Sequence, residues 1–160
     1  MGGGSRGNRI SYSNQQKKMN HPLMIYADRE GAEKPKRKVF ISFHMEDEYA
    51  KELLSAQARS EKFSLEFINY SINEPFDEKW KEQCRERIAM TSVLIVLIGL
   101  ETYMREAVNW EINEAYRQGK TVIGVRIHRH ETHRVPQQML DNDAKIMNWD
   151  IDEISKELSK

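Results

Sequence analysis

The chain has 160 residues, of which 39% are hydrophobic and 31% charged, and its formal net charge is zero. This length suits one domain whose core needs no disulfide or metal to hold it together. The only cysteine, Cys84, cannot form an internal disulfide, and no apolar stretch approaches the ~20 residues that cross a bilayer. These features argue against a disulfide-stapled or membrane-spanning protein, and we expect a cytoplasmic location and no membrane partner.

The charge is divided unevenly along the chain. Residues 1–38 hold nine basic and three acidic side chains, a net charge of +6, so the other 122 residues carry −6. Residues 1–37 have little apolar content apart from a possible short strand at 23–27, and they begin like a glycine linker. We therefore expect a basic, flexible leader over 1–37, part of it an added linker, and a folded domain over 38–160.

From residue 38 onward, short β-prone runs alternate with amphipathic segments. Strands are expected at 39–43, 65–68, 93–98, 121–127 and 145–149. Helices are expected at 46–59, 77–90, 103–118 and from about 152. The inward-facing residues expected on the first three helices are Ala50, Leu53, Leu54 and Gln57, then Trp80, Cys84 and Ile88, then Val108, Ile112 and Ala115. Asp77 is the expected N-cap of the second helix, and Gly119 the stop of the third.

The run at 93–98 decides the type of sheet. Six consecutive apolar residues without alternation predict a strand covered on both faces, as in the middle of a parallel sheet. Together with the alternating elements, this predicts an α/β fold, a flavodoxin-like doubly wound parallel sheet in a single domain, with the first and third strands adjacent. A ligand would then bind beyond the carboxyl ends of the strands. The residues expected there are 43–44, 69–71, 99–102 and 126–128.

Several kinds of site are disfavoured at this rim. No glycine-rich loop follows the first strand, which argues against a dinucleotide fingerprint or a P-loop. The third strand ends without a carboxylate that could accept phosphate, which argues against a receiver domain. His128, His130 and His133 raise a zinc hypothesis, but their spacing matches no metal motif, so we expect a solvated basic loop and no metal site.

Two residues on helices complete the set of candidates. Cys84 lies on the core face of its expected helix, where it is expected to pack as a small hydrophobe rather than act as a nucleophile. Glu111 follows Trp110 on the third helix, and composition alone favours a surface glutamate on an amphipathic helix. Neither residue type, taken alone, identifies an active site.

Three segments considered together resemble a known family. The first segment is 39–44 and the second is 92–99. The third is 108–112 taken together with the run 119–125 that follows it. In order and spacing they are similar to bacterial TIR-like domains, especially the TIR-domain subunit of Thoeris anti-phage systems. The resemblance covers about residues 38–127, and more weakly 146–158.

The resemblance implies an enzyme that consumes NAD as its substrate, with no cofactor, by cleaving the nicotinamide–ribose bond. It further implies a cyclic ADP-ribose-type product that activates a partner effector protein. The family's catalytic glutamate falls on Glu111, where a carboxylate could stabilise the oxocarbenium character that develops on the ribose. The implied substrate-binding residues are Phe40, Ser42, Phe43, His44 and Trp110.

Two other functions stay open at this point. TIR folds also serve as interaction modules, and residues 69–75 lack the Arg-Asp and Pro-Gly signature found after the second strand in animal and plant TIR domains. A non-catalytic assembly module, forming homo-oligomers, is therefore the main alternative. The +6 leader raises a weaker one, nucleic-acid binding, which the acidic body and the lack of interleaved aromatic residues disfavour.

Overall fold

The computed structural model describes residues 35–61, 63–69 and 76–160. Nearly all of the expected leader 1–37 lies outside the described residues, as do the possible strand at 23–27 and most of the loop 69–75. Residues 36–160 form one compact unit. In the described part of the chain, no helix is both long and apolar enough to span a membrane.

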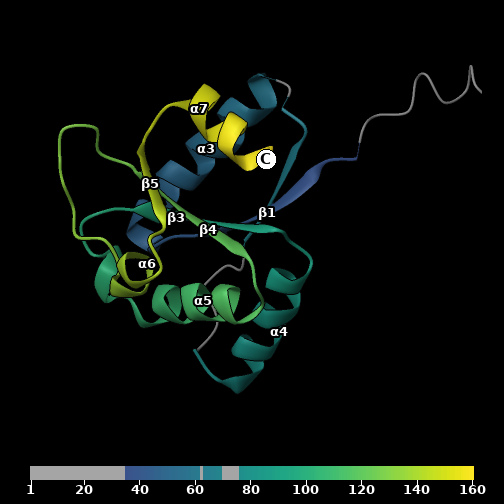
Figure 1. Ribbon diagram of the computed structural model, residues 1–160, viewed down its shortest axis with the longest axis vertical. Coiled ribbons are helices and arrows are strands. Elements are labelled where there is room, and N and C mark those ends of the chain that lie inside the picture. The colour runs from purple at the N-terminus through teal and green to yellow at the C-terminus, as the bar shows by residue number, and fades with distance from the viewer. Residues whose placement is uncertain (1–34, 62, 70–75) are drawn as a thin grey trace, which may run out of the picture. The chain divides into compact units, whose positions relative to one another are not determined.

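The five expected strands are all present and form one parallel sheet (Figure 1). They are β1 (Arg37–Ser42), β2 (Leu65–Ile68), β3 (Val93–Ile98), β4 (Thr121–Arg126) and β5 (Lys145–Asn148). Their order, β2-β1-β3-β4-β5, places the first and third strands side by side and confirms the flavodoxin-like arrangement. Ser42, the last residue of β1, pairs in register with Val96 of β3, so the carboxyl ends of the strands meet at one edge.

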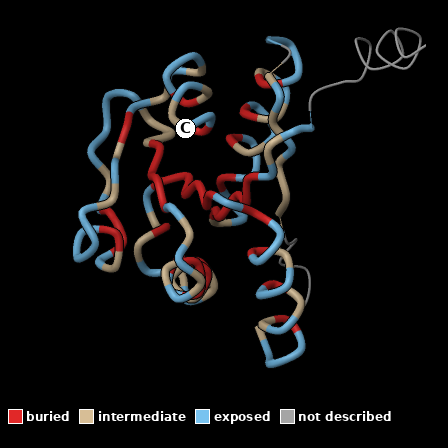
Figure 2. The backbone as a smooth tube through the Cα atoms, turned by 45° about the vertical axis from the view of Figure 1, so that its right-hand side comes forward, coloured by how far each residue is buried: buried red, intermediate tan, exposed pale blue. Residues whose placement is uncertain are grey.

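The helices cover both faces of this sheet, as the apolar run of β3 predicts. They are α3 (Glu48–Ser60), α4 (Glu78–Ala89), α5 (Glu106–Arg117), α6 (Gln137–Asp141) and α7 (Ile151–Leu158), with 3-10 turns η1 (Met45–Asp47) and η2 (Thr102–Met104). Helices α4, α5 and α6 pack into one hydrophobic cluster, and α3 and α7 into the other, on opposite sides of the sheet (Figure 1). All six residues of β3 are buried because the strand lies between β1 and β4 and between both helix layers (Figure 2).

The predicted helix signals are confirmed where they are specific. The Asp77 carboxylate accepts a hydrogen bond from the Trp80 backbone N–H at 2.9 Å and caps α4. Gly119 lies two residues after the end of α5 and has a φ of +69°, a conformation that glycine adopts at little cost. The expected inward faces of α4 and α5 are buried as well.

Two predictions about helices need correction. Leu53 was expected to face inward but is exposed, and Ala58 is buried in its place. The buried row of α3 recurs every four residues at Ala50, Leu54 and Ala58, and Leu53 lies beside this row rather than in it. The short helix α6, which follows Pro136, was not predicted, because five residues are too few to show a helical period.

Candidate active site

Glu111 lies on the inward face of α5, close to the carboxyl end of β1. Its side chain is 3% exposed. The expectation of a surface glutamate is therefore wrong. Glu111 is buried because it lies three residues after Val108 and four before Ala115, both of which face the core, so the helical period turns its side chain the same way.

Two side chains from two other elements contact the Glu111 carboxylate. The Ser42 hydroxyl, at the end of β1, donates a hydrogen bond to Glu111 Oε2. The Cys84 thiol, on α4, lies 3.8 Å from Glu111 Oε1 and donates a weak hydrogen bond to it. Each carboxylate oxygen thus has one donor, and β1, α4 and α5 meet at one buried acid.

The surroundings of Glu111 favour its protonated form. Burial raises the pKa of Glu111 to about 8, although the hydrogen bonds from Ser42 and Cys84 act in the opposite direction by stabilising the charge. Burial, with the nearby Glu111 carboxylate, also raises the pKa of the Cys84 thiol. In this arrangement Glu111 is mostly neutral at pH 7, and Cys84 is a thiol rather than a nucleophilic thiolate.

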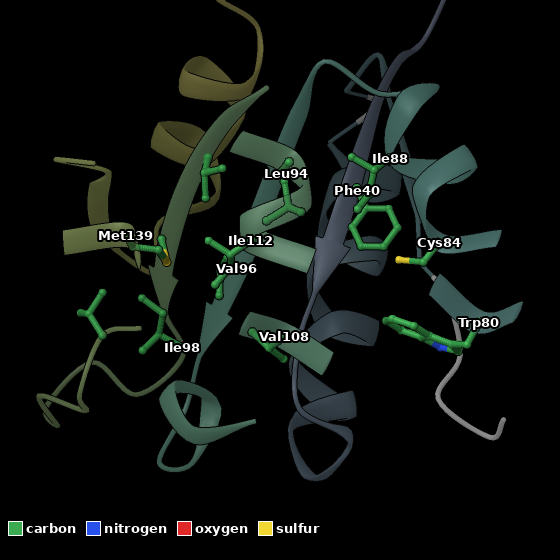
Figure 3. Packing of buried hydrophobic residues seen from close by; sticks show 13 residues of the cluster. Phe40, Trp80, Cys84, Ile88, Leu94, Val96, Ile98, Val108, Ile112 and Met139 are labelled. Atoms are coloured by element: carbon green, nitrogen blue, oxygen red, sulfur yellow. The ribbon is translucent and has the colours of Figure 1, made fainter. Parts of the chain in front are cut away.

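Successive residues along a strand point to opposite faces of the sheet, so the other candidates at β1 lie on different sides. Phe40, two residues before Ser42, lies on the same face but is fully buried in the cluster with Trp80 and Cys84 (Figure 3). In this conformation its ring has no surface open to a ligand. Phe43 points to the opposite face and packs in the cluster with α3 and α7, where Lys51 Nζ lies 5.7 Å from its ring centroid. Only Ser42 of this group contacts Glu111.

Trp110 is partly buried beside the site and already has aromatic and cationic neighbours. Its ring packs edge-on against Trp80 with 5.5 Å between centroids, and the Arg85 guanidinium lies 5.7 Å from the ring centroid. Trp80 is fully buried, which confirms that it belongs to the core. A flat base could therefore stack on Trp110 only after Arg85 moves aside.

His44 lies beyond the end of β1, among carboxylates. Its Nε2 is 3.6 Å from Glu101 Oε2 and 3.7 Å from Glu46 Oε2. Close by in the chain, Asp47 is 8% exposed and its carboxylate lies directly against the Cα of Gly99, the residue that follows β3. Sequence analysis placed Gly99 at this rim but did not single out Asp47, whose burial depends on the packing of η1 against the end of β3.

The sequence analysis missed the contact between Cys84 and Glu111. The place of Cys84 on the core side of α4 was predicted correctly, but its contact with Glu111 was not. The inward residues of α4 and α5 were both available from the helical period. What the period does not give is how far each helix is shifted along the other, and this shift decides which side chains meet.

The fold has relatives among solved structures. The TIR domain of the Toll-related receptor TRR-2 from Hydra magnipapillata is 13% identical, with a TM-score of 0.58, and the match covers 76% of this chain and 98% of the other. A chain of the RPS4 and RRS1 TIR domain heterodimer is 12% identical, with a TM-score of 0.53, covering 78% and 96%. At these identities the likeness shows the fold, and it defines a TIR-like α/β domain.

The amino-acid sequence identifies the protein family more narrowly than the fold does. Residues 40–132, more than half of the chain, match the family model described as Thoeris protein ThsB, TIR-like domain. The chain therefore belongs to this family, and the resemblance drawn from its short segments is confirmed. A comparison with curated proteins gives no match.

Proposed function

We propose that this chain cleaves the bond between nicotinamide and ribose in NAD, and that Glu111 is the catalytic residue. The observation that carries the proposal is the buried Glu111 carboxylate, held by Ser42 and Cys84 at the carboxyl edge of a parallel sheet. Ligands of open α/β sheets bind at this edge. Membership of the Thoeris ThsB family supports a role in anti-phage defence.

The proposed cleavage mainly requires a carboxylate that the protein holds beside the ribose. When the ribose C1′–N bond breaks, its electron pair leaves with nicotinamide, which becomes neutral, and positive charge develops on the ribose. A carboxylate beside the ribose stabilises that charge and can hydrogen-bond its hydroxyl groups. A water molecule that attacks C1′ gives ADP-ribose, and an internal nitrogen of the adenine gives a cyclic product.

The protonation state of Glu111 must change for this mechanism. With a pKa of about 8 in the closed site, Glu111 is mostly neutral at pH 7 and cannot balance a developing cation. The nicotinamide ring of NAD carries a positive charge, and a positive neighbour favours the ionised form of an acid. Binding of NAD beside Glu111 would thus lower its pKa and create the carboxylate where it is needed. The Ser42 hydroxyl helps, because its hydrogen bond stabilises the ionised form.

Substrate also has to reach a covered residue. Glu111 is 3% exposed and Ser42 is buried with it. Since Cys84 on α4 covers one carboxylate oxygen, we expect productive binding to require a shift of α4 relative to α5. Activity should accordingly depend on a trigger that opens the site, such as infection or assembly.

The experiment compares NAD in cells that express the wild type or Glu111→Gln, with and without phage challenge. Glutamine keeps the volume of glutamate but cannot become a carboxylate. We expect NAD loss and a new ADP-ribose species, identified by mass spectrometry, only in challenged wild-type cells. Glu106→Gln, an exposed position on the same helix, is the matched control and should behave as wild type. Equal NAD loss in the Glu111→Gln variant would rule out Glu111 as the catalytic residue.

The product would carry the signal to a separate effector protein. We propose that a cyclic ADP-ribose-type nucleotide is that signal. Product transfer tests it, because a filtrate of challenged wild-type cells that contains only small molecules should activate the effector in vitro. The same filtrate from the Glu111→Gln strain should not.

A second candidate function is self-assembly, favoured by an exposed apolar row. Met45, Tyr49 and Leu53 follow one another at four-residue intervals along η1 and α3, and all three are exposed. We propose a second copy of the chain as the occupant of this row. Sedimentation velocity at increasing concentration tests it. Leu53→Lys should abolish association, whereas Met90→Lys, a change at an exposed methionine next to α4, should not.

A further inference from the structure

The loop after β4 brings two histidines and a glutamate together at the carboxyl edge of the sheet. Its backbone is held at two points. The Glu131 N–H donates to the His128 carbonyl oxygen at 3.3 Å, which closes a turn between them. Arg126 Nη1 donates to the His133 carbonyl oxygen at 2.9 Å. These two bonds hold the backbone of the loop at His128 and at His133.

Three potential ligand atoms converge within this loop. His128, Glu131 and His133 each offer one, and these atoms all lie within 4.8 Å of one another. The two imidazole rings have centroids 5.1 Å apart at an interplanar angle of 79°. Ligand atoms around a tetrahedral zinc ion, each about 2.1 Å from the metal, lie roughly 3.4 Å apart. A small adjustment of these side chains would reach that geometry.

The buried Nε2 atom of His133 faces the carboxylate of Glu131. The side chain of His133 is 9% exposed. Glu131 Oε2 lies 3.0 Å from His133 Nε2, yet within the described part of the chain no hydrogen bond satisfies this nitrogen. A cation between the two atoms would satisfy both at once.

One acidic side chain from outside the loop lies near its histidines. Asp47 is 8% exposed, and the described residues offer its Oδ2 no hydrogen bond. Burial raises the pKa of the Asp47 carboxyl group, while the nearby His44, His128 and His133 act in the opposite direction. Tyr49 Oη lies 3.4 Å from His128 Nε2 and helps to hold that ring.

We infer that His128, Glu131 and His133 form a site for a divalent transition-metal ion of the zinc class. Imidazole nitrogens suit zinc, and two histidines with one carboxylate leave a coordination position free for water or a ligand. The sequence analysis expected a solvated loop without a metal; residues 129–132 and 134 are indeed exposed, whereas His128 and His133 are partly buried. His130, which the sequence analysis considered together with the other two histidines, is exposed and takes no part in this group.

Calorimetric titration of Zn²⁺ into the full chain, freed of metal with EDTA and dialysed, tests this inference. We expect one zinc ion per chain, and no comparable binding of Mg²⁺, which prefers oxygen ligands. His133→Ala and Glu131→Gln should each weaken zinc binding by about tenfold or more. His130→Ala, in the same loop, is the matched control and should bind as the wild type does. Because Glu131 is exposed, its substitution leaves the fold intact even if His133→Ala unfolds the loop.

A second measurement does not depend on heats of binding. A ligand that binds only the folded state raises the melting temperature. At the same zinc concentration, zinc should therefore raise the melting temperature of the wild type and of His130→Ala clearly more than that of Glu131→Gln. Failure of the wild type to bind zinc, or equal binding by Glu131→Gln, would overturn the inference. Neither measurement uses NAD, so the outcome is independent of the proposed activity.

Discussion

The Ser42 hydroxyl donates a hydrogen bond to Glu111 Oε2, joining the end of β1 to α5 across 69 positions of the chain. Both residues are buried, so the bond replaces contacts with water that each group would have in the unfolded chain. The bond links the central sheet to Glu111. Among the described residues Glu111 has no basic partner, whereas Glu114, the other buried acid of α5, pairs with Arg117 and Arg85. The chemistry proposed for this protein depends on that arrangement.

The stability of the fold should depend on pH through Glu111. Its pKa rises from an ordinary value of 4.5 to about 8 on folding, so the folded state binds this proton more tightly than the unfolded state. The resulting stabilisation is fully present below about pH 4.5 and is lost as the pH rises towards 8. Relative to Glu111→Gln, which has no such proton, the wild type should lose up to about 1.4 kcal/mol per pH unit in this window.

Urea denaturation of both proteins at pH 5, 6, 7 and 8 measures this difference. The control is Glu106→Gln, which removes an exposed carboxylate from the same helix and should follow the wild-type curve. Parallel curves for the wild type and Glu111→Gln would show that Glu111 ionises as it does in the unfolded chain, and so is not enclosed in solution.

Removing the Ser42 hydroxyl should move the activity to higher pH. The hydrogen bond from Ser42 lowers the pKa of Glu111, so Ser42→Ala should raise that pKa further and reduce the ionised fraction at pH 7. We expect NAD turnover at pH 7 to fall by about tenfold, the effect of losing one hydrogen bond to a charged group. The pH–rate profile measures it, and Ser55→Ala on α3 is the control. A lower rate with an unmoved profile would contradict this role and leave Ser42 a structural one.

Cys84 should react slowly with thiol reagents in the folded protein. It is fully buried, and burial raises its pKa, whereas alkylation requires an accessible thiolate. Since Cys84 is the only cysteine of the chain, the rate of labelling reports the opening of α4 without interference. We expect native labelling at pH 8 to be far slower than labelling in urea, as followed by a chromogenic disulfide reagent. Equally fast reaction in both would mean that the closed site is not the main state in solution.

Substituting Gly99 should destabilise the fold through Asp47. A Cβ at Gly99 would lie 2.7 Å from Asp47 Cγ, closer than real side chains approach, and Asp47 is buried. We expect Gly99→Ala to cost about 1–3 kcal/mol in urea denaturation, as overpacking usually does. Asp47→Ala should remove most of that cost, because it removes the atoms that collide.

Gly119→Ala is the matched control for this double substitution. At Gly119 nothing lies within 4 Å of an added Cβ, and the cost of alanine, about 1–2 kcal/mol, comes from the positive φ. That cost should be the same with or without Asp47, since the sites share no contact. If Asp47→Ala leaves the cost at Gly99 unchanged, the collision is not its cause.

Local sequence rules determined most of the secondary structure and the sheet. The unbroken apolar run of β3 predicted a central, doubly covered strand, and the Asp77 cap and Gly119 stop placed two helix ends correctly. These features were readable because each depends on residues within a few positions of one another. Leu53 was misplaced because the helical period admits both the i+3 and the i+4 neighbour of Ala50, and only the packing of α3 selects the i+4 row.

The site, in contrast, was decided by tertiary structure. Sequence resemblance pointed to Glu111, but its burial, its raised pKa and its contact with Cys84 depend on how α4 lies against α5 and β1. The grouping of His128 with His133 and Glu131, rather than with His130, depends likewise on the path of one loop. The physical reason is the same in both places. Periodicity tells which face of an element is covered, whereas the distance between two side chains far apart in sequence is set by how the elements pack.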